Sequence, residues 1–226
     1  GIYSADPRSV PQAHKLKRIS YNEMLEMASL GAKVLHKRSV ELAKKYHVRL
    51  VVRSSFEPVE GTIIEEGRKV ESVVISGIVE DRKIATVSII GIQDKPGVAF
   101  TVFSLLAKVG INVDIILQSV GRDGTKDIVF TIAEDDLYEV ETIFAKERDL
   151  LDCEDIIYDK DVAKLSIVGA GLEANPGVAA NAFEALFSKG INIKMISTSE
   201  IKISLIISES DSKRGAQAIH NLFFPL

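Results

Sequence analysis

The sequence predicts an α+β fold that contains two copies of a βαββαβ unit, with the first copy inserted into the second. Three observations lead to this prediction. Short motifs recur at a fixed offset, apolar β-branched runs alternate with segments of helical period, and one strand-like run has no partner of its own. A helix-rich amino-terminal region precedes the repeat.

The repeat is clearest where a strand leads into a helix. Pro96-Gly97-Val98-Ala99 recurs as residues 176–179, and Gly110-Ile111-Asn112 recurs as residues 190–192. The offset of 80 residues holds without a gap from Pro96 to Ser119. Such a coherent offset indicates that one structural unit has been duplicated.

The first copy, residues 82–162, contains every element of the βαββαβ order. Pro96 suits the first turn of a helix, and Gly110 suits a helix C-cap. We expect Phe100, Phe103 and Leu106, with Ala107, to form the buried face of that helix. The expected elements are a strand at 85–92, a helix from 96, strands at 111–120 and 127–133 joined by the turn 121–124, a helix at 137–148 and a strand at 153–159.

The second copy, residues 163–226, lacks the last strand. Its elements are predicted at 164–169, 177–189, 191–199, 202–208 and 213–224. An unpaired sheet edge is normally covered, so the copy needs a fourth strand from elsewhere. Residues 70–80 form a strand-like run before the first copy and are expected to complete the second.

The amino-terminal region, residues 1–56, reads as the edge of a larger α/β domain. Residues 20–46 have helical period with a break at Gly31, and Ser20 with Glu23 forms a capping-box pattern. Leu50 to Arg53 is predicted as a short buried strand. Residues 57–69 are polar with proline and glycine, and we interpret them as a linker.

The composition excludes several classes of protein. The 226 residues are 46% hydrophobic and carry a net charge of −4, which argues against a nucleic-acid partner. The apolar runs are too short to cross a bilayer, so no membrane partner is expected. The single cysteine, Cys153, excludes an internal disulfide and fits a cytoplasmic protein. The four histidines show no ligand spacing with Cys153, so we expect no metal site. No other group of residues forms a recognisable catalytic set, so we expect no catalytic residue in this chain.

The loop from Asp94 to Ala99 is the best candidate for ligand binding. Backbone N–H groups at the start of the following helix can bind a carboxylate, and Asp94 can bind an ammonium group, which together hold an α-amino acid. Asn112 and Gln118 could add hydrogen bonds. The alternative is that Pro96-Gly97 only starts the helix and Asp94 caps it. The second copy has a longer loop that ends at Asn175 in place of this aspartate, so we expect it to serve mainly as a wall or a dimer surface.

These residues, with Ile196-Ser197-Thr198-Ser199-Glu200-Ile201, resemble the paired, ferredoxin-like ACT domains of aspartate kinase. Residues 1–8 and 29–36 resemble the end of the amino-acid-kinase catalytic domain of that family, with Lys37 in place of its usual proline. The resemblance implies an intact enzyme that phosphorylates L-aspartate with Mg-ATP. It places Tyr3, Arg8 and Lys33 around the nucleotide. No cofactor is expected in this chain, and we expect it to be inactive alone.

The resemblance also implies feedback control by lysine and/or threonine. The effector would bind between the ACT domains of a homodimer, contacting Asp94, Pro96, Gly97, Val98, Ala99, Asn112 and Gln118 of one chain and Ala179, Asn192, Ile193 and Glu200 of the other. The chain would also partner the catalytic domain or subunit of aspartate kinase. Two alternatives remain: a ligand-free structural dimerisation module, and a piece of the enzyme whose catalytic domain is cleaved or omitted.

Overall fold

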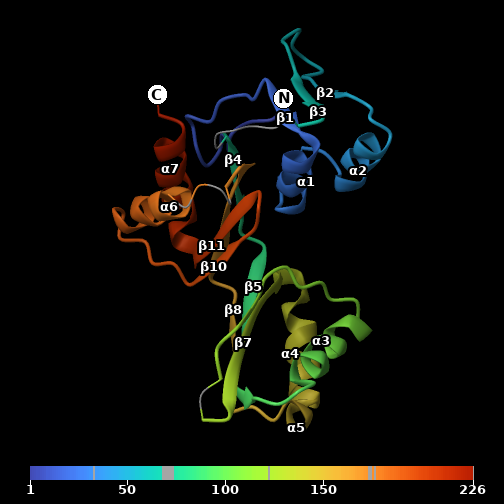
Figure 1. The fold of residues 1–226 in the computed structure, drawn as a ribbon, viewed down its shortest axis with the longest axis vertical. Helices are drawn as coiled ribbons and strands as arrows, with labels where there is room; N and C mark the ends of the chain where they lie inside the picture. The colour runs from blue at the N-terminus through green and yellow to red at the C-terminus, as the bar shows by residue number, and fades with distance from the viewer. Residues whose placement is uncertain (33, 68–73, 122, 173–174, 176, 226) are drawn as a thin grey trace. The chain divides into compact units, whose positions relative to one another are not determined.

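The structure, a computed structural model, describes residues 1–226 except 33, 68–73, 122, 173–174, 176 and 226 (Figure 1). The chain forms two compact units: residues 83–162, and a unit made of residues 1–82 with residues 163–226. A continuous segment is therefore inserted into a discontinuous one. The predicted α+β class and the predicted insertion are both confirmed.

The inserted unit is the first ACT-like copy. Its elements are β5 (Ile84–Gln93), α3 (Val98–Lys108), β6 (Ile116–Gln118), β7 (Thr125–Ala133), η1 (Glu134–Asp136), α4 (Leu137–Lys146), α5 (Arg148–Leu151) and β8 (Asp155–Asp159). The antiparallel sheet has the order β6-β7-β5-β8, with α3 and α4 on one face (Figure 1). This is the predicted βαββαβ arrangement.

The buried face of α3 differs from the prediction. Leu106 is buried and Phe103 packs against the core, as predicted, but Phe100 is 78% exposed and Ala107 is exposed as well. Val98, Val102 and Leu105 complete the buried face instead. Helix α3 is apolar on more than one face, so its period alone fits two buried stripes. The sheet selects the stripe that starts at Val98, which rotates Phe100 into solvent.

Strand β6 is also shorter than the predicted strand 111–120. Only Ile116 to Gln118 pair regularly with β7. Just before them, the Thr131 hydroxyl accepts the Ile115 N–H at 3.0 Å, and the Thr131 N–H donates to the Ile115 carbonyl at 3.0 Å. This side-chain bond replaces one rung of the ladder, so the regular strand begins later.

The second copy lies in the discontinuous unit. Its elements are β4 (Val74–Asp81), β9 (Val162–Ala170), α6 (Gly177–Phe187), β10 (Met195–Thr198), β11 (Lys202–Ser208), η2 (Glu209–Asp211) and α7 (Ser212–Phe223). The sheet has the order β10-β11-β9-β4. Strand β4 pairs antiparallel with β9, with Asp81 opposite Lys164. The run before the first copy thus completes the second sheet, although its residues 70–73 lie outside the described residues.

The amino-terminal elements form a separate layer of the same unit. They are β1 (Arg18–Ser20), α1 (Tyr21–Ser29), α2 (Lys37–Lys45), β2 (Leu50–Val52) and β3 (Thr62–Glu65). The three strands form a sheet in the order β1-β3-β2. The capping box of Ser20 and Glu23 is present, as the sequence predicts. Helix α1 ends at Ser29 with Leu30 as its C-cap, just before the predicted break at Gly31.

Two predictions for this region are wrong. The expected linker contains β3, because the Thr62 hydroxyl accepts the Ile2 N–H at 2.8 Å and donates to the Leu16 carbonyl at 2.7 Å. These bonds seat β3 between β1 and β2. The strand at Leu50 to Val52 is not buried: Val51 is 51% exposed, since β2 is the edge strand of its sheet.

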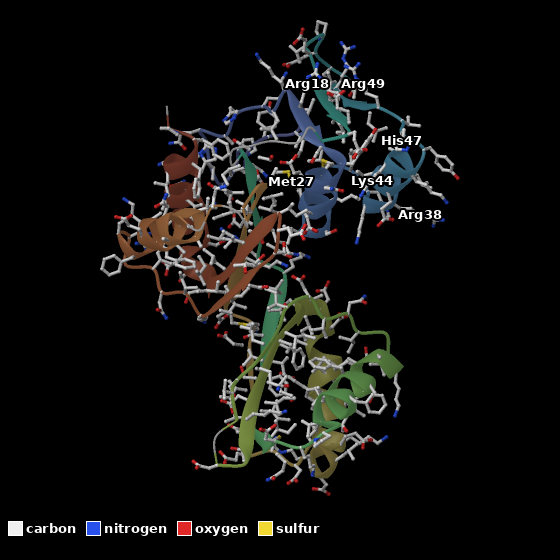
Figure 2. All side chains as sticks on the ribbon, viewed as in Figure 1. Arg18, Met27, Arg38, Lys44, His47 and Arg49 are labelled. Atoms are coloured by element: carbon white, nitrogen blue, oxygen red, sulfur yellow. The ribbon has the colours of Figure 1, made fainter. Side chains whose placement is uncertain are left out.

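Strand β9 is buried along nearly all its length because both faces of its sheet are covered. On one face, Leu165 and Ile167 pack with α6 and α7. On the other, Val168 packs with Met24 and Met27 of α1. Met27 lies on the side of α1 that faces β4 (Figure 2). The amino-terminal region is thus built onto the second ACT-like sheet.

Candidate functional site: a pocket in the second ACT-like domain

A cavity of about 450 Å³ opens where three segments of the second ACT-like sheet meet. These segments are the loop after β9, the first turn of α6, and the turn between β10 and β11. The lining residues are Leu172, Asn175, Ala179, Thr198, Ser199, Glu200 and Ile203. The volume is within the usual range for small-molecule pockets, about 300–1,000 Å³.

Backbone hydrogen bonds hold the two sides of the pocket. The Ser199 N–H donates to the Lys202 carbonyl at 2.8 Å, which closes the turn that carries Glu200. Opposite, the Asn175 side-chain amide donates to the Gly171 carbonyl at 3.0 Å, and the Asn175 carbonyl accepts the Val178 N–H at 3.1 Å. The loop is thereby tied to the start of α6.

The lining combines both kinds of receptor that a zwitterion needs. Glu200 supplies a carboxylate for an ammonium group. Ala179 lies in the first turn of α6, where backbone N–H groups and the helix dipole favour a carboxylate. Leu172 and Ile203, 5% and 4% exposed, form an apolar floor. This arrangement can hold a free amino acid.

The pocket includes some of the expected partner residues and omits others. Ala179 and Glu200 line it, whereas Asn192 and Ile193 do not. Asn192 is exposed, and Ile193 packs against the core beneath α6. Sequence reasoning assigned no binding role to Leu172, Thr198, Ser199 and Ile203. Thr198 and Ser199 lie next to Glu200 in the motif 196–201, and this position in the motif could have indicated that they line the same pocket.

In the first ACT-like domain, Asp94 already has a cationic partner. Its carboxylate lies 2.9 Å from the Lys126 Nζ, and the Lys126 side chain is 11% exposed. The Asp94 N–H donates to the Gly124 carbonyl at 2.8 Å. The carboxylate is 46% exposed, so a ligand ammonium would share Asp94 with Lys126.

The start of α3 contradicts two expectations, that Pro96 lies in the first turn and, in the alternative interpretation, that Asp94 caps the helix. Gly97 is the N-cap residue with a φ of 93°, and the helix begins at Val98. Pro96 therefore precedes the cap and is not in the first turn. Asp94 makes no side-chain capping bond within the described residues. The helix thus begins after a glycine, Gly97, in the left-handed conformation that glycine adopts readily, and not after a side chain that caps it.

The remaining expected contacts of this domain lie on its surface. Pro96 and Ala99 are exposed and Val98 is buried. Asn112 follows the end of α3 and is exposed, and Gln118 ends the edge strand β6. Whether any of them contacts an effector stays a prediction.

Comparisons with known proteins agree with this architecture. Family models match residues 1–54 (amino acid kinase family), 85–149 (ACT domain) and 165–223 (ACT domain). The aspartokinase of Helicobacter pylori is 46% identical over 99% of this chain and 56% of its own length. The regulatory subunit of aspartate kinase from Thermus thermophilus, in its ligand-free form, is 38% identical with a TM-score of 0.63, covering 66% of this chain and 98% of that one.

The chain belongs to the aspartate kinase family. It spans about half the length of the curated aspartate kinases it matches. Its two ACT domains correspond to the regulatory region, since the Thermus subunit is matched almost completely. Aspartokinase III of E. coli, in complex with lysine and aspartate, shares the fold at 24% identity and a TM-score of 0.74, over 99% of this chain and 50% of its own.

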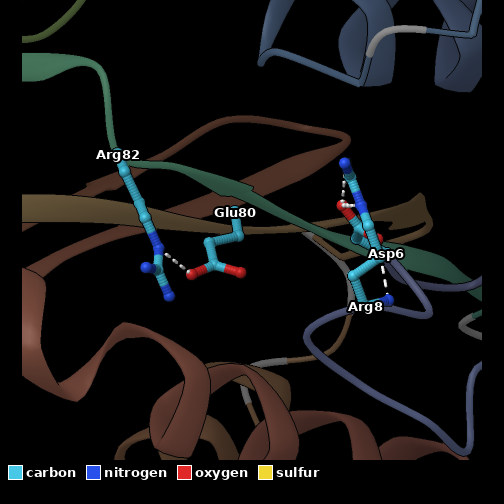
Figure 3. A network of polar contacts seen from close by, with 4 residues as sticks. All are labelled: Asp6, Arg8, Glu80 and Arg82. Carbon is cyan, nitrogen blue, oxygen red and sulfur yellow. Dashed lines mark hydrogen bonds and ion pairs between the residues drawn. The ribbon is translucent and has the colours of Figure 1, made fainter.

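The kinase-family part contains the residues expected near the nucleotide. Arg8 is 90% exposed in its side chain and pairs with Asp6 at 2.7 Å (Figure 3). The hydrogen bond from Arg8 holds the pKa of the Asp6 carboxyl below its ordinary value of 3.8. Tyr3 is 40% exposed and forms a backbone bridge with Lys15. Lys33 lies outside the described residues.

A second acidic group lies near this pair. Glu80 of β4 accepts a hydrogen bond from Arg82 at 2.5 Å (Figure 3). It also accepts a hydrogen bond from the hydroxyl of Ser212 on α7. Burial alone would raise the pKa of Glu80, but hydrogen bonds from Ser212, Ser9 and Arg82 outweigh it and lower the pKa below 4.5. This group joins β4, α7 and the amino-terminal segment, and its role is structural.

Other site types find no support within the described part of the chain. No group of three or more His, Cys, Asp or Glu residues there could hold a metal ion. No helix there is long and apolar enough to span a membrane. Arg38 and His47 project into solvent around α2 (Figure 2). The Lys44 Nζ donates to the Asn22 side chain of α1 at 2.7 Å.

Proposed function

We propose that this chain is the effector-binding, regulatory part of an aspartate kinase, and that its ACT domains bind lysine and/or threonine. The observation that carries the proposal is the pocket of the second ACT domain. It combines the Glu200 carboxylate, the first turn of α6 and an apolar floor. These are the groups that hold the ammonium, the carboxylate and the side chain of a free amino acid.

The binding unit is a homodimer in which the Asp94 loop of one copy faces the Glu200 pocket of the other. Two observations support this. The pocket is partly open to solvent, and in the first ACT domain the edge strand β6 exposes Ile116 and Leu117. A ligand held between two copies binds the clamped dimer better than the loose one, and so shifts that population.

The regulated reaction belongs to the intact enzyme, which transfers a phosphoryl group from Mg-ATP to L-aspartate in the cytoplasm. Tyr3 and Arg8 are exposed, and each is next in sequence to a buried serine, Ser4 and Ser9 respectively, which suits a segment that lines a nucleotide. Arg8 would offer its guanidinium to a phosphate in exchange for Asp6. The catalytic half, in cis or as a separate subunit, supplies the rest of the site.

The experiment is thermal unfolding of this chain with lysine and threonine, singly and together. A ligand that binds the folded state raises the melting temperature. Glu200→Gln removes the carboxylate charge and should abolish most of the shift, while Asp94→Asn should weaken it. Glu184→Gln, an exposed change on α6 of the same domain, is the matched control and should leave the shift intact.

A ligand-free dimerisation module is the second candidate, and the exposed apolar residues Ile116, Leu117 and Val120 favour it. Sedimentation, which measures the oligomeric state, together with the thermal-shift experiment distinguishes this module from the regulatory proposal. If the chain is a stable dimer whose melting temperature neither amino acid changes, the regulatory proposal is wrong and the structural module stands.

A further inference from the structure

Four side chains join the carboxyl-terminal helix α7 to the amino-terminal segment: Ser4, His14, His220 and Phe224. The Ser4 Oγ lies 2.9 Å from His220 Nε2 and 3.2 Å from His14 Nδ1. The His14 backbone N–H donates to the same Oγ at 3.1 Å. Phe224 packs against both imidazoles, with ring centroids at 5.1 Å from His14 and 4.7 Å from His220.

The protons of this cluster can be assigned from its bonds. The Ser4 hydroxyl has one proton to donate and two lone pairs to accept with. The His14 backbone N–H occupies one lone pair. If neutral His220 carries its proton on Nε2, it donates to the second lone pair, and the Ser4 O–H then donates to His14 Nδ1. The proton and both lone pairs of the Ser4 hydroxyl then all take part in hydrogen bonds.

The surroundings of the other ring nitrogen, Nδ1, determine which protonation state of His220 is compatible with the folded structure. His220 is 1% exposed, and its Nδ1 is buried without a hydrogen-bond partner in the described structure. A bare lone pair there costs less than an unpaired N–H. A protonated imidazole would carry an N–H on both nitrogens, so it would leave a charged donor buried and unpaired.

We propose that Ser4 and His220, with His14 and Phe224, form an acid-sensitive latch between the kinase-family segment and the second ACT domain. The latch is closed while His220 is neutral. Protonation of His220 opens it and loosens residues 1–16 from α7. The two sides of the latch belong to the regions matched by the amino-acid-kinase and ACT families, so acid weakens the link between them.

The titration supports this direction. Burial, and secondarily the neighbouring His14, lower the pKa of His220 below its ordinary value of 6.5. The folded state therefore favours neutral His220. The stability that this provides is fully present above about pH 6.5 and is lost as the pH falls through the folded-state pKa.

The charged groups on the elements around α7 do not reverse this effect. They are Glu80 and Asp81 on β4, Glu184 on α6, Glu209 and Asp211 in η2, and Asp6, Arg8 and Lys15 in the amino-terminal segment. None of the carboxylates is among the causes of the His220 shift. Glu80 and Asp6 titrate below pH 4.5, so they do not interfere at pH 5.0–7.5.

The test compares thermal unfolding of the full chain and His220→Gln from pH 7.5 to 5.0. Glutamine keeps an amide N–H that can donate to Ser4 but does not titrate. The control is His47→Asn, which removes an exposed histidine at a φ of 53° that asparagine tolerates. One proton taken up on unfolding raises the unfolding constant up to roughly tenfold per pH unit. We expect this acid loss in the parent and in His47→Asn, and a flatter profile in His220→Gln.

Two measurements on the unmodified chain keep the proposal testable if His220→Gln does not fold. Nitrogen-15 NMR should show the Nε2–H tautomer of His220 and a titration below 6.5. Hydrogen exchange at Ser4 and Leu16, whose N–H groups bond within the segment, should speed up at pH 5.5 after correction for intrinsic rates. An Nδ1–H tautomer, an unshifted titration, or equal pH profiles for the parent and His220→Gln would overturn the latch.

Discussion

Phe130 shows how much of the first ACT domain depends on one side chain. It is fully buried on the central part of the sheet, and its ring meets Phe103 and Phe144 edge to face at 5.4 and 6.3 Å. Such pairs add to the free energy already gained by burying the ring. The contacts come from β7, α3 and α4, so this residue holds both helices onto the sheet.

Replacing Phe130 by alanine should therefore destabilise residues 83–162 by about 3–5 kcal/mol. The cost comes from lost burial and from a cavity that three elements cannot close. Native-state hydrogen exchange of β5 amides reports the unfolding free energy of this unit. Tyr138→Ala, at a position that is 79% exposed, is the control and should change it by about 0.5 kcal/mol or less. Equal effects would mean that the aromatic cluster is not the centre of this core.

At the pocket, residues with a charged side chain or a position at a helix start could be predicted from the sequence. Residues that only contribute an apolar wall could not. Glu200 and Ala179 could be proposed because their residue types suit an ammonium and a helix start. Leu172 and Ile203 read as ordinary core residues, because nothing in a sequence shows which apolar side chains border a cavity. The pairing of Asp94 with Lys126 was also hidden, since it depends on the register of β5 against β7.

At the scale of elements, β4 is closely approached by α1 and by the amino-terminal segment. The β4–β9 register shifts between Ile75 and Gly77, and a Cβ on Gly77 would lie 2.5 Å from Met27 Cε and 2.8 Å from the Ser4 carbonyl oxygen. Glycine therefore allows α1 and the amino-terminal segment to approach the sheet. The packing of these two elements on β4 depends on this missing side chain.

Gly77→Ala should lower the stability of the discontinuous unit by about 1–3 kcal/mol, the usual cost of overpacking. Met27 can rotate away, but the Ser4 backbone has to move. Gly177→Ala is the matched control, because a Cβ there meets nothing within 4 Å, and it should be neutral or slightly stabilising. The melting temperatures of the parent chain, Gly77→Ala and Gly177→Ala measure these effects. An unchanged melting temperature for Gly77→Ala would show that α1 is only loosely attached.

Elements with a strong local pattern could be predicted, and elements defined by distant partners could not. Helix α1 was found from its capping box, and β9 from its apolar run. Strand β3 was missed because it is short and lies in a polar segment with glycines on either side. Such a segment looks like a linker until Ile2 and Leu16 bond Thr62. The apolar pattern of α3 fits two faces, so only the sheet decides which one is buried.

At the scale of the whole molecule, the insertion of one domain into another makes a simple prediction. Residues 83–162 leave and re-enter the discontinuous unit between β4 and β9, which are adjacent antiparallel strands. Asp81 lies opposite Lys164, so the chain ends at Arg82 and Ala163 are close enough for a short hairpin turn. The inserted domain is thus not needed to bring these two strands together.

Replacing residues 83–162 by Asn-Gly should give a folded protein that unfolds cooperatively, because this dipeptide favours the type I′ turn that matches the strand twist. Circular dichroism during heating measures this, and the Glu200 pocket should persist because all its lining residues remain. The control joins Arg82 directly to Ala163, so that these two residues must form the turn themselves, and it should melt at a lower temperature. If the Asn-Gly protein shows no cooperative transition, the second ACT domain depends on the first for its stability, and the division into two self-sufficient units is wrong.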